Sequence, residues 1–232
     1  MTARVDDQPA FILHRRDYSN SSLILELLTA DHGRVGVLAK GARRRKDVGS
    51  FQPGCRLSVG WRGQGELKTL SAIESRHIPL PPDCYLPLFY VNELLIALTA
   101  RFDPLPGLFA HYQHLLLSFG RDDLQTALRG FEIELLEVLG LMPVLDRDRA
   151  GAELAPQADY VLDPAGGLSR CAEPRPDSAP GRLWCSLAAR HFEVPEVRDL
   201  ARRALRQIID SNLAGRELQS RSLFLQLTRR DR

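Results

Sequence analysis

The densest cluster of cations in this sequence is a short run, residues 40–46, that reads Lys-Gly-Ala-Arg-Arg-Arg-Lys. Five of its seven residues are basic, and a single acid, Asp47, follows. Guanidinium and ammonium groups on an exposed loop contact phosphate oxygens at little desolvation cost, so the run is typical of a loop that binds nucleic acid. A solvated loop without a ligand explains a short charge run equally well. On this run alone both interpretations stay open.

Four more cations come from segments with the alternation of β-strands. Arg56 and Arg62 alternate with apolar residues in the segment 55–62, and Arg34 lies opposite Val35 and Val37. Alternation therefore places these arginines on the faces that point away from the core. This predicts that they form a basic surface on the folded protein and not only a basic stretch of sequence. The nucleic-acid-binding residues predicted from the sequence are Arg34, Lys40, Arg43, Arg44, Arg45, Lys46, Arg56, Arg62 and Lys68.

Stacking of unpaired bases would require exposed aromatic rings. Trp61 has the same parity as Leu57 and Val59, so we expect it in the core. Tyr18 and Phe51 lie in predicted loops and are the better candidates for base contact. The pattern favours a binder that contacts the phosphate backbone and tolerates many sequences.

Motifs for catalysis and for metal binding do not occur in the sequence. It has no Gly-x-Ser-x-Gly elbow. Gly36 and Gly41 have the spacing of a phosphate-binding loop, but Ala42 occupies the position at which that motif requires lysine. The cysteines lack the paired spacing of a structural zinc site, so we expect reduced thiols, no metal and no cofactor. They are Cys55, Cys84, Cys171 and Cys185.

Charge is distributed unevenly along the 232 residues. Residues 1–80 carry 13 Lys and Arg against 8 Asp and Glu, a net +5; residues 81–150 carry a net −5 and residues 151–232 a net +2. The first segment is thus the candidate for binding a polyanion. No apolar stretch approaches the roughly 20 residues of a membrane span, and the first twenty residues hold only a short apolar run, so we expect a cytoplasmic protein.

The periodicity predicts an α+β protein. Strands are expected at 10–15, 22–29, 34–40, 55–62 and 66–74, which suits a five-stranded barrel of the OB type. The segment Pro-Leu-Pro-Pro at 79–82 ends the strands, so we predict an OB domain at 1–80 and a helical domain at 81–232.

Helices are expected from residue 84, at 105–119, at 124–139, from 195 and at 217–227, around a Pro- and Gly-rich irregular insertion at 146–181 with a small hairpin. A stripe of Arg198, Arg202 and Arg206 at helical spacing is a solvated face or a DNA contact. Arg129, on an acidic helix, could receive a peptide carboxylate or pair with Glu132 or Glu134.

Seven segments, in order along nearly the whole chain, resemble one known family. They are FILHR (11–15), TADHGRV (29–35), AKGAR (39–43), GELKTL (65–70), YVNELL (90–95), RGFEIELL (129–136) and LQSRSLF (218–224). The sequence is similar in these segments to the RecO family of bacterial recombination mediators. The resemblance implies an N-terminal OB domain, a helical domain and a non-catalytic, nucleoid-associated role in DNA repair.

The resemblance also implies partners and residue roles. Members of the family bind single- and double-stranded DNA, anneal complementary strands and, with the partner RecR, help RecA replace single-strand-binding protein (SSB). They dock the acidic C-terminal tail of SSB on the helical domain. Carried over to matching positions, this gives Lys40 and Arg43 the DNA role and Arg129 and Arg221 the tail-binding role. Some relatives hold zinc with four cysteines, whereas only Cys171 and Cys185 stand in the irregular insertion here, so a metal-free region is expected.

Two other functions remain as alternatives. The chain could be a protein-interaction adaptor whose barrel presents the basic loop without touching nucleic acid. It could also be a nuclease without a familiar motif. Cleavage of labelled DNA in the presence of magnesium would reveal such an activity.

Overall fold

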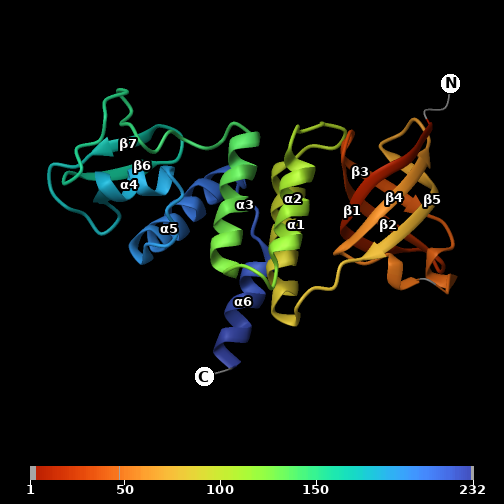
Figure 1. Ribbon diagram of the computed structural model, residues 1–232. Coiled ribbons are helices and arrows are strands. Elements are labelled where there is room, and N and C mark those ends of the chain that lie inside the picture. Colours follow the sequence, from red (N-terminus) through yellow and green to blue (C-terminus); the bar gives the residue numbers. More distant parts are fainter. Residues whose placement is uncertain (1–3, 47, 231–232) are drawn as a thin grey trace. The chain divides into compact units, whose positions relative to one another are not determined.

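The computed structural model describes residues 4–46 and 48–230 (Figure 1). The chain divides into two compact units, which we describe separately. The first unit comprises the residues up to Arg121 together with those from Glu217, and the second unit is Asp122–Arg216. Strands end at His77 and helical structure begins at Pro82, where the sequence predicted the change of period. The first unit also contains helices, so the domain boundary near residue 80 stays a prediction.

Within the described residues, five strands of the first unit close into a barrel, as the sequence predicted. They are β1 (Arg4–Tyr18), β2 (Ser22–Thr29), β3 (Gly33–Ala39), β4 (Cys55–Arg62) and β5 (Leu67–His77), shown in red to orange in Figure 1. Their order around the barrel is β1-β2-β3-β5-β4, with β3 and β5 parallel and the other pairs antiparallel. This is the arrangement of an OB-type barrel.

The barrel core follows the predicted alternation. Val35 and Val37 of β3 are fully buried, and Leu57, Val59 and Trp61 of β4 are at most 3% exposed. Trp61 is therefore a core residue, as expected from its parity.

Phe51 contradicts the prediction that it could contact bases. Its side chain directly follows the short helical turn Val48–Ser50, is 0% exposed and belongs to the barrel core. Tyr18, the other aromatic candidate, ends β1 and is 51% exposed.

Helices α1 (Tyr85–Leu98) and α2 (Leu108–Ser118) cover part of the outer face of the barrel in the same unit. Phe11 points out of the barrel, and its ring centroid lies 5.1 Å from those of Phe109 and Tyr112. The Tyr112 hydroxyl donates to Asn92 Oδ1 at 2.6 Å, and Asn92 Nδ2 donates to the carbonyl of Leu13 at 2.9 Å. Full burial raises the pKa of Tyr112 far above its usual value, so the hydroxyl remains a donor.

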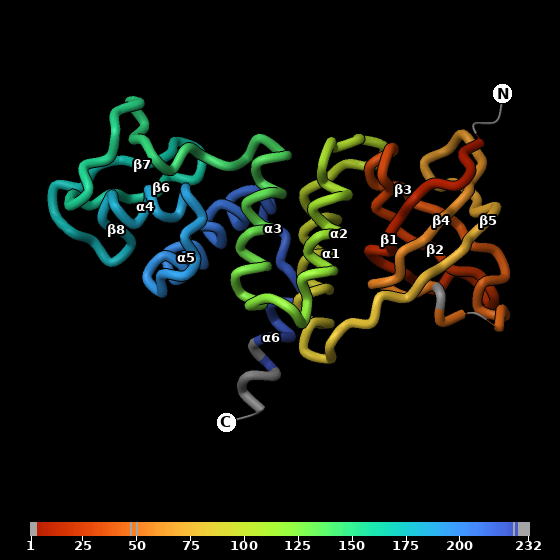
Figure 2. Tube along the Cα trace, viewed as in Figure 1, coloured from red at the N-terminus to blue at the C-terminus, as the bar shows by residue number. Residues whose placement is uncertain are grey.

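Helix α6 (Gln219–Arg230) returns to the first unit and starts beside α1 (Figure 2). The 3-10 turns η1 (Ala42–Arg44), η2 (Val48–Ser50) and η3 (Pro82–Cys84) complete this unit as described. No helix in the described part of the chain is long and apolar enough to cross a membrane.

The second unit contains α3 (Leu124–Val138), α4 (Gly181–Ala188), α5 (Pro195–Asn212) and a small sheet in the order β7-β6-β8. The predicted hairpin is confirmed: β6 (Asp159–Asp163) pairs with β7 (Gly167–Arg170), while the short β8 (Ala179–Pro180) was not predicted. Helix α4 was not predicted either. Its Trp184 is 1% exposed and donates to the carbonyls of Tyr160 and Ala179, which fixes the helix on the sheet.

Candidate nucleic-acid interface

The basic loop, residues 40–46, leaves β3 through a tight turn. Gly41 has a φ of 69°, in the left-handed region that favours glycine, and open space surrounds it. The next residue, Ala42, is 1% exposed and belongs to the barrel core. One small apolar side chain thus anchors the loop, while Lys40, Arg43, Arg44, Arg45 and Lys46 are all exposed.

The basic loop is attached to the turn between β1 and β2. The amide of Arg43 donates to the carbonyl of Ser21 at 2.9 Å, and its guanidinium donates to the carbonyl of Ser19 at 3.1 Å. The guanidinium also pairs with Asp17 at 3.2 Å. Because both side chains of this pair are well exposed, the pair contributes at most about 1 kcal/mol, and a phosphate could displace the carboxylate.

The other cations of the basic loop differ in their contacts. The guanidinium of Arg45 lies 5.6 Å from the centroid of the buried Phe51 ring, which restricts its position. Within residues 4–46 and 48–230, Lys40, Arg44 and Lys46 form no ion pair. Their charges are available to an anionic ligand at little desolvation cost.

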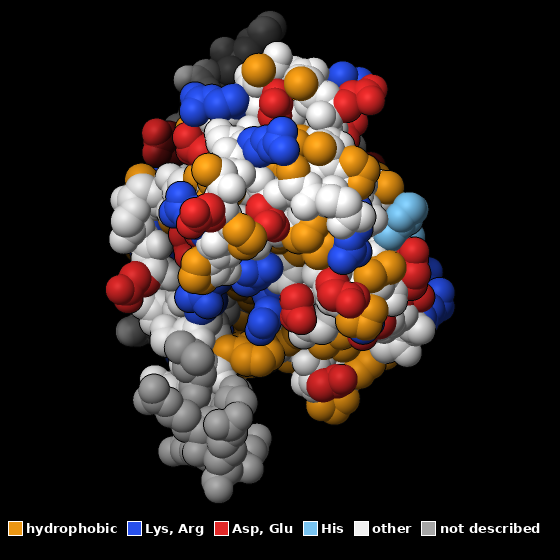
Figure 3. Space-filling view, turned by 90° about the vertical axis from the view of Figure 1, so that its left-hand side faces the viewer, with side chains coloured by type: hydrophobic (Ala, Val, Ile, Leu, Met, Phe, Trp, Pro, Cys, Tyr) orange, Lys and Arg blue, Asp and Glu red, His pale blue; other side chains and the backbone are white. Residues whose placement is uncertain are grey.

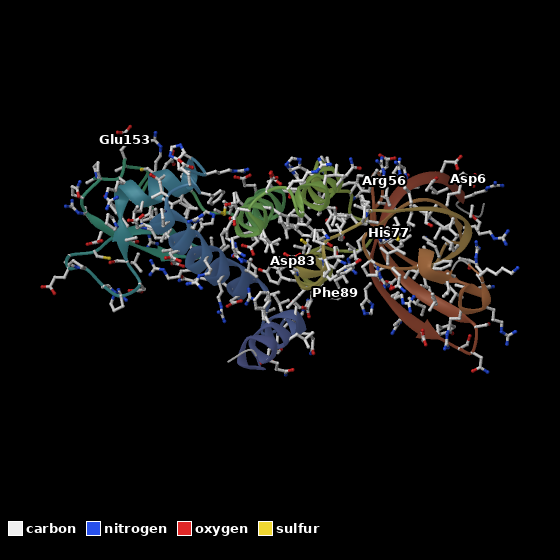
Figure 4. The ribbon with its side chains drawn as sticks, turned by 60° about the horizontal axis from the view of Figure 1, so that its bottom comes forward. Asp6, Arg56, His77, Asp83, Phe89 and Glu153 are labelled. Atoms are coloured by element: carbon white, nitrogen blue, oxygen red, sulfur yellow. The ribbon has the colours of Figure 1, made fainter. Side chains whose placement is uncertain are left out.

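Two of the predicted strand cations, Arg56 and Arg62, lie at opposite ends of β4. Arg56, on β4 (Figure 4), is exposed. It pairs in register with Arg76 of β5, so two arginines are neighbours there. Arg62 lies six residues further along β4, about 20 Å away at the usual rise of a strand. It pairs in register with Arg4 of β1. Lys68 Nζ lies 4.6 Å from the centroid of the Phe102 ring.

Arg34 differs from the other predicted cations because its side chain is largely buried. Only 13% of it is exposed, and it pairs with Glu26 at 3.1 Å and donates to the carbonyl of Thr99 at 2.7 Å. Alternation correctly placed Arg34 outside the barrel core, but the chain at the end of α1 covers that face. We therefore leave Arg34 out of the interface.

Sequence reasoning missed two exposed arginines of the same unit, Arg16 and Arg76. Arg16 lies on β1 next to Asp17, the partner of Arg43. Strict alternation would have placed Arg16 on the core face, because it shares the parity of the core residues 10 and 12. A β-bulge between Ile12 and His14 shifts the register of β1, so Arg16 is exposed instead.

Arg129, predicted to bind a peptide tail, lies in the second unit. Its guanidinium pairs with Glu132 at 2.7 Å, and the carboxylate of Glu132 is fully buried. Arg129 Nε is buried without a hydrogen-bond partner in the described structure. The side chain also lines a surface pocket of about 370 Å³ together with Arg198 and Arg202 of the predicted arginine stripe, and with Asp123 and Asp199.

The surface of the second unit is otherwise mixed in charge. On the face of this unit that Figure 3 presents, basic and acidic side chains are interspersed. An anion would therefore have to be selected by a local pocket such as the arginine pocket (Arg129, Arg198 and Arg202) rather than by the surface as a whole.

Arg221, the other residue predicted to bind the tail, belongs to α6 in the first unit. Its guanidinium lies 5.9 Å from the centroid of the Tyr90 ring on α1. Arg129 and Arg221 thus belong to different compact units.

The cysteines of the second unit show no metal-binding arrangement. Among the residues that the structure describes, no group of three or more His, Cys, Asp or Glu side chains could hold a metal ion. Burial raises the pKa of the Cys185 thiol, so it stays protonated at neutral pH.

Comparison with known proteins identifies the family. Residues 2–79 match the family Recombination protein O N terminal, and residues 84–183 match Recombination protein O C terminal. The chain is 43% identical to the DNA repair protein RecO of Polaromonas sp. over 80% of its length and 78% of the relative. It is 37% identical to that of Halorhodospira halophila, over 95% and 97% of the two chains. It is 40% identical to that of Methylococcus capsulatus, over 93% and 91%. The chain therefore belongs to the RecO family of DNA repair proteins.

Proposed function

We propose that this chain is a non-catalytic recombination mediator. It binds single- and double-stranded DNA, anneals complementary strands and, with RecR, helps RecA load onto single-stranded DNA coated with SSB. The observation that carries the proposal is the basic loop, which presents five exposed cations from a buried anchor at Ala42. Membership of the family supplies the setting in DNA repair. A cytoplasmic, nucleoid-associated location is part of the same proposal.

Annealing follows from the chemistry of such a loop. Two complementary strands repel one another through their phosphates, and a basic surface that neutralises both backbones removes this barrier. The side chains of Lys40, Arg44 and Lys46 are exposed and positively charged, so they suit contact with the phosphate backbone rather than recognition of bases. Arg56 with Arg76, and separately Arg62 and Lys68, provide further cationic positions on the barrel for a long strand.

The arginine pocket of the second unit is the proposed site for the acidic tail of SSB. A C-terminal carboxylate and acidic side chains match its three guanidinium groups. Arg221 remains a proposed contact for the same partner, although the structure gives it a local role against Tyr90.

Filter binding of the purified chain to oligonucleotides at two salt concentrations tests the proposal. We expect binding to both strand types that weakens steeply as salt rises, together with faster pairing of complementary oligonucleotides. Absence of binding at low salt would overturn the proposal and favour the protein-interaction adaptor. Incubation of labelled DNA with the chain and magnesium should leave the DNA intact, and cleavage would contradict the non-catalytic role.

A further inference from the structure

A second surface of the first unit has no role in the account above. It is a groove of about 680 Å³ on the outer face of the barrel, bounded by β1, β2, α1 and the start of α6. One wall is a single stripe of α1 at the spacing i, i+3, i+4 and i+7, formed by Phe89, Asn92, Glu93 and Ile96. The opposite wall is formed by neighbouring strand residues, including Arg16 with its register partner Ile24.

An exposed aromatic ring lines the apolar part of the groove. Phe89 is 47% exposed on α1 (Figure 4), and Leu223 of α6 is 48% exposed beside the same groove. A large apolar side chain that is half exposed in a concave site is typical of a binding groove rather than of a packed core.

The charged part of the groove is net positive. Glu26 is paired with both Arg34 and Arg101, and Gly36 leaves room for the Arg101 guanidinium, since a Cβ there would lie 3.1 Å from its Cζ. The carboxylate of Glu93 accepts hydrogen bonds from the first amides of α6. Arg16 forms no ion pair among the described residues, and it is exposed.

The groove also begins close to the basic loop. Arg16 directly precedes Asp17, the residue that pairs with Arg43 of the basic loop. Arg16 is therefore one residue along β1 from the contact that holds the basic loop, so a strand bound at the loop passes close to the groove.

We propose that this groove holds an unpaired nucleotide of single-stranded DNA, with its phosphate on Arg16 and its base stacked against Phe89. This inference rests on the proposed function and adds a preference to it. A base can stack on Phe89 only when it has left a duplex, so the groove favours single strands, whereas the basic loop binds both strand types. The positive charge of the groove and its proximity to the basic loop favour a nucleotide over an acidic peptide.

The test compares Phe89→Leu with the control Tyr85→Leu, which changes an exposed aromatic residue on the same helix outside the groove. We expect Phe89→Leu to weaken binding of a single-stranded oligonucleotide about fivefold or more and to leave duplex binding unchanged. Tyr85→Leu should change neither. In an oligonucleotide with 2-aminopurine, the fluorescence quenching caused by the wild-type chain should be reduced by Phe89→Leu alone.

Each failure has a separate meaning. If the wild-type chain does not bind DNA, the proposed function fails and the inference with it. If the wild type binds DNA and substitutions in the basic loop weaken that binding, but Phe89→Leu binds single strands as tightly as the wild type, the inference alone is overturned. Arg16→Gln provides a second variant on the strand side, and it should weaken single-strand binding and lower the salt slope by about 0.7. Loss of an acidic peptide's affinity in Phe89→Leu without loss of DNA affinity would overturn the choice of ligand.

Discussion

Glu93 and Ser220 are 127 residues apart in the chain, yet one carboxylate oxygen of Glu93 accepts hydrogen bonds from both the amide and the hydroxyl of Ser220, at 2.9 and 2.6 Å. The second oxygen accepts from the amide of Gln219 at 2.7 Å. Glu93 of α1 therefore caps the N-terminus of α6, where free amides and the helix dipole favour a negative charge. This contact fixes the end of the groove that Leu223 lines.

Replacing Glu93 by alanine should loosen α6 without unfolding the barrel. The three hydrogen bonds to the carboxylate disappear together, so we expect the amides of Gln219 and Ser220 to exchange with solvent about tenfold faster or more. Native-state hydrogen exchange measures this rate. Glu66→Ala, which removes an exposed carboxylate of the same unit, is the control. Equal exchange rates in the wild type and Glu93→Ala would show that the cap does not hold the helix.

Glu26→Gln should destabilise the barrel. The carboxylate is 11% exposed and faces the guanidinium groups of Arg34 and Arg101, and the hydrogen bond from Arg101 raises the pKa of that arginine. The neutral amide would leave two partly buried cations without an anion, at a cost of about 2 kcal/mol in the free energy of unfolding. Urea denaturation followed by Trp61 fluorescence in a Trp184→Phe background reports on the barrel. An unchanged midpoint would contradict the assigned role of Glu26.

The cap of α3 makes the second unit sensitive to acid. Asp123 accepts hydrogen bonds from the amide and hydroxyl of Thr126, at 2.9 and 2.8 Å, and these bonds lower the pKa of its carboxyl below the usual value. A lowered pKa means that the stabilisation is fully present above about pH 4 and is lost as the pH falls through the folded-state pKa.

Asp123→Ala should therefore cost about 1 kcal/mol at pH 7, and the difference from the wild type should shrink in acid. Asp123→Asn retains a good cap without a titrating group, so its advantage over alanine should not vary with pH. Unfolding followed by Trp184 fluorescence between pH 7 and pH 3 measures both differences. A constant gap between wild type and Asp123→Ala over this range would refute the assignment.

Arg129→Ala should weaken binding of a peptide with the acidic C-terminal sequence of SSB. The substitution removes one of three guanidinium groups around the arginine pocket, and we expect a loss of about tenfold in affinity. Arg206→Ala is the matched control, because Arg206 belongs to the same stripe on α5 but does not line the pocket. A fluorescence titration with the labelled peptide that gave equal affinities for wild type and Arg129→Ala would place the tail elsewhere.

The barrel could be predicted closely because its signals are local. Strands β2 and β4 begin and end where alternation and turn residues placed them. β1 is longer than predicted, since its polar first residues are held by pairing with β4 rather than by an apolar face. Helix α4 was missed because it has only eight residues, directly follows a proline and depends on the packing of Trp184.

The site could be predicted only in part, because exposure depends on tertiary contacts. Arg34 and Arg56 have the same relation to their strands, yet the chain beyond α1 covers Arg34 and leaves Arg56 in solvent. Phe51 lies in a loop by sequence but is buried in the core. The groove could not be predicted from the sequence either, because the stripe that begins at Phe89 has the same helical spacing as an ordinary core face.

The salt dependence of DNA binding tests the central claim, that the basic loop binds phosphate, most directly. Fluorescence anisotropy of a labelled single strand, measured over a range of salt concentrations, would compare three proteins. The first is the wild type, and the second is a loop variant in which Arg43, Arg44 and Arg45 are all replaced by Glu. The third is a control variant in which three exposed arginines of the second unit, Arg170, Arg175 and Arg182, are replaced by Glu. We predict that the loop variant keeps its fold, binds at least about tenfold more weakly and has a log–log salt slope flatter by about 2, while the control changes far less. Equal affinities and slopes for the loop variant and the wild type would contradict the account.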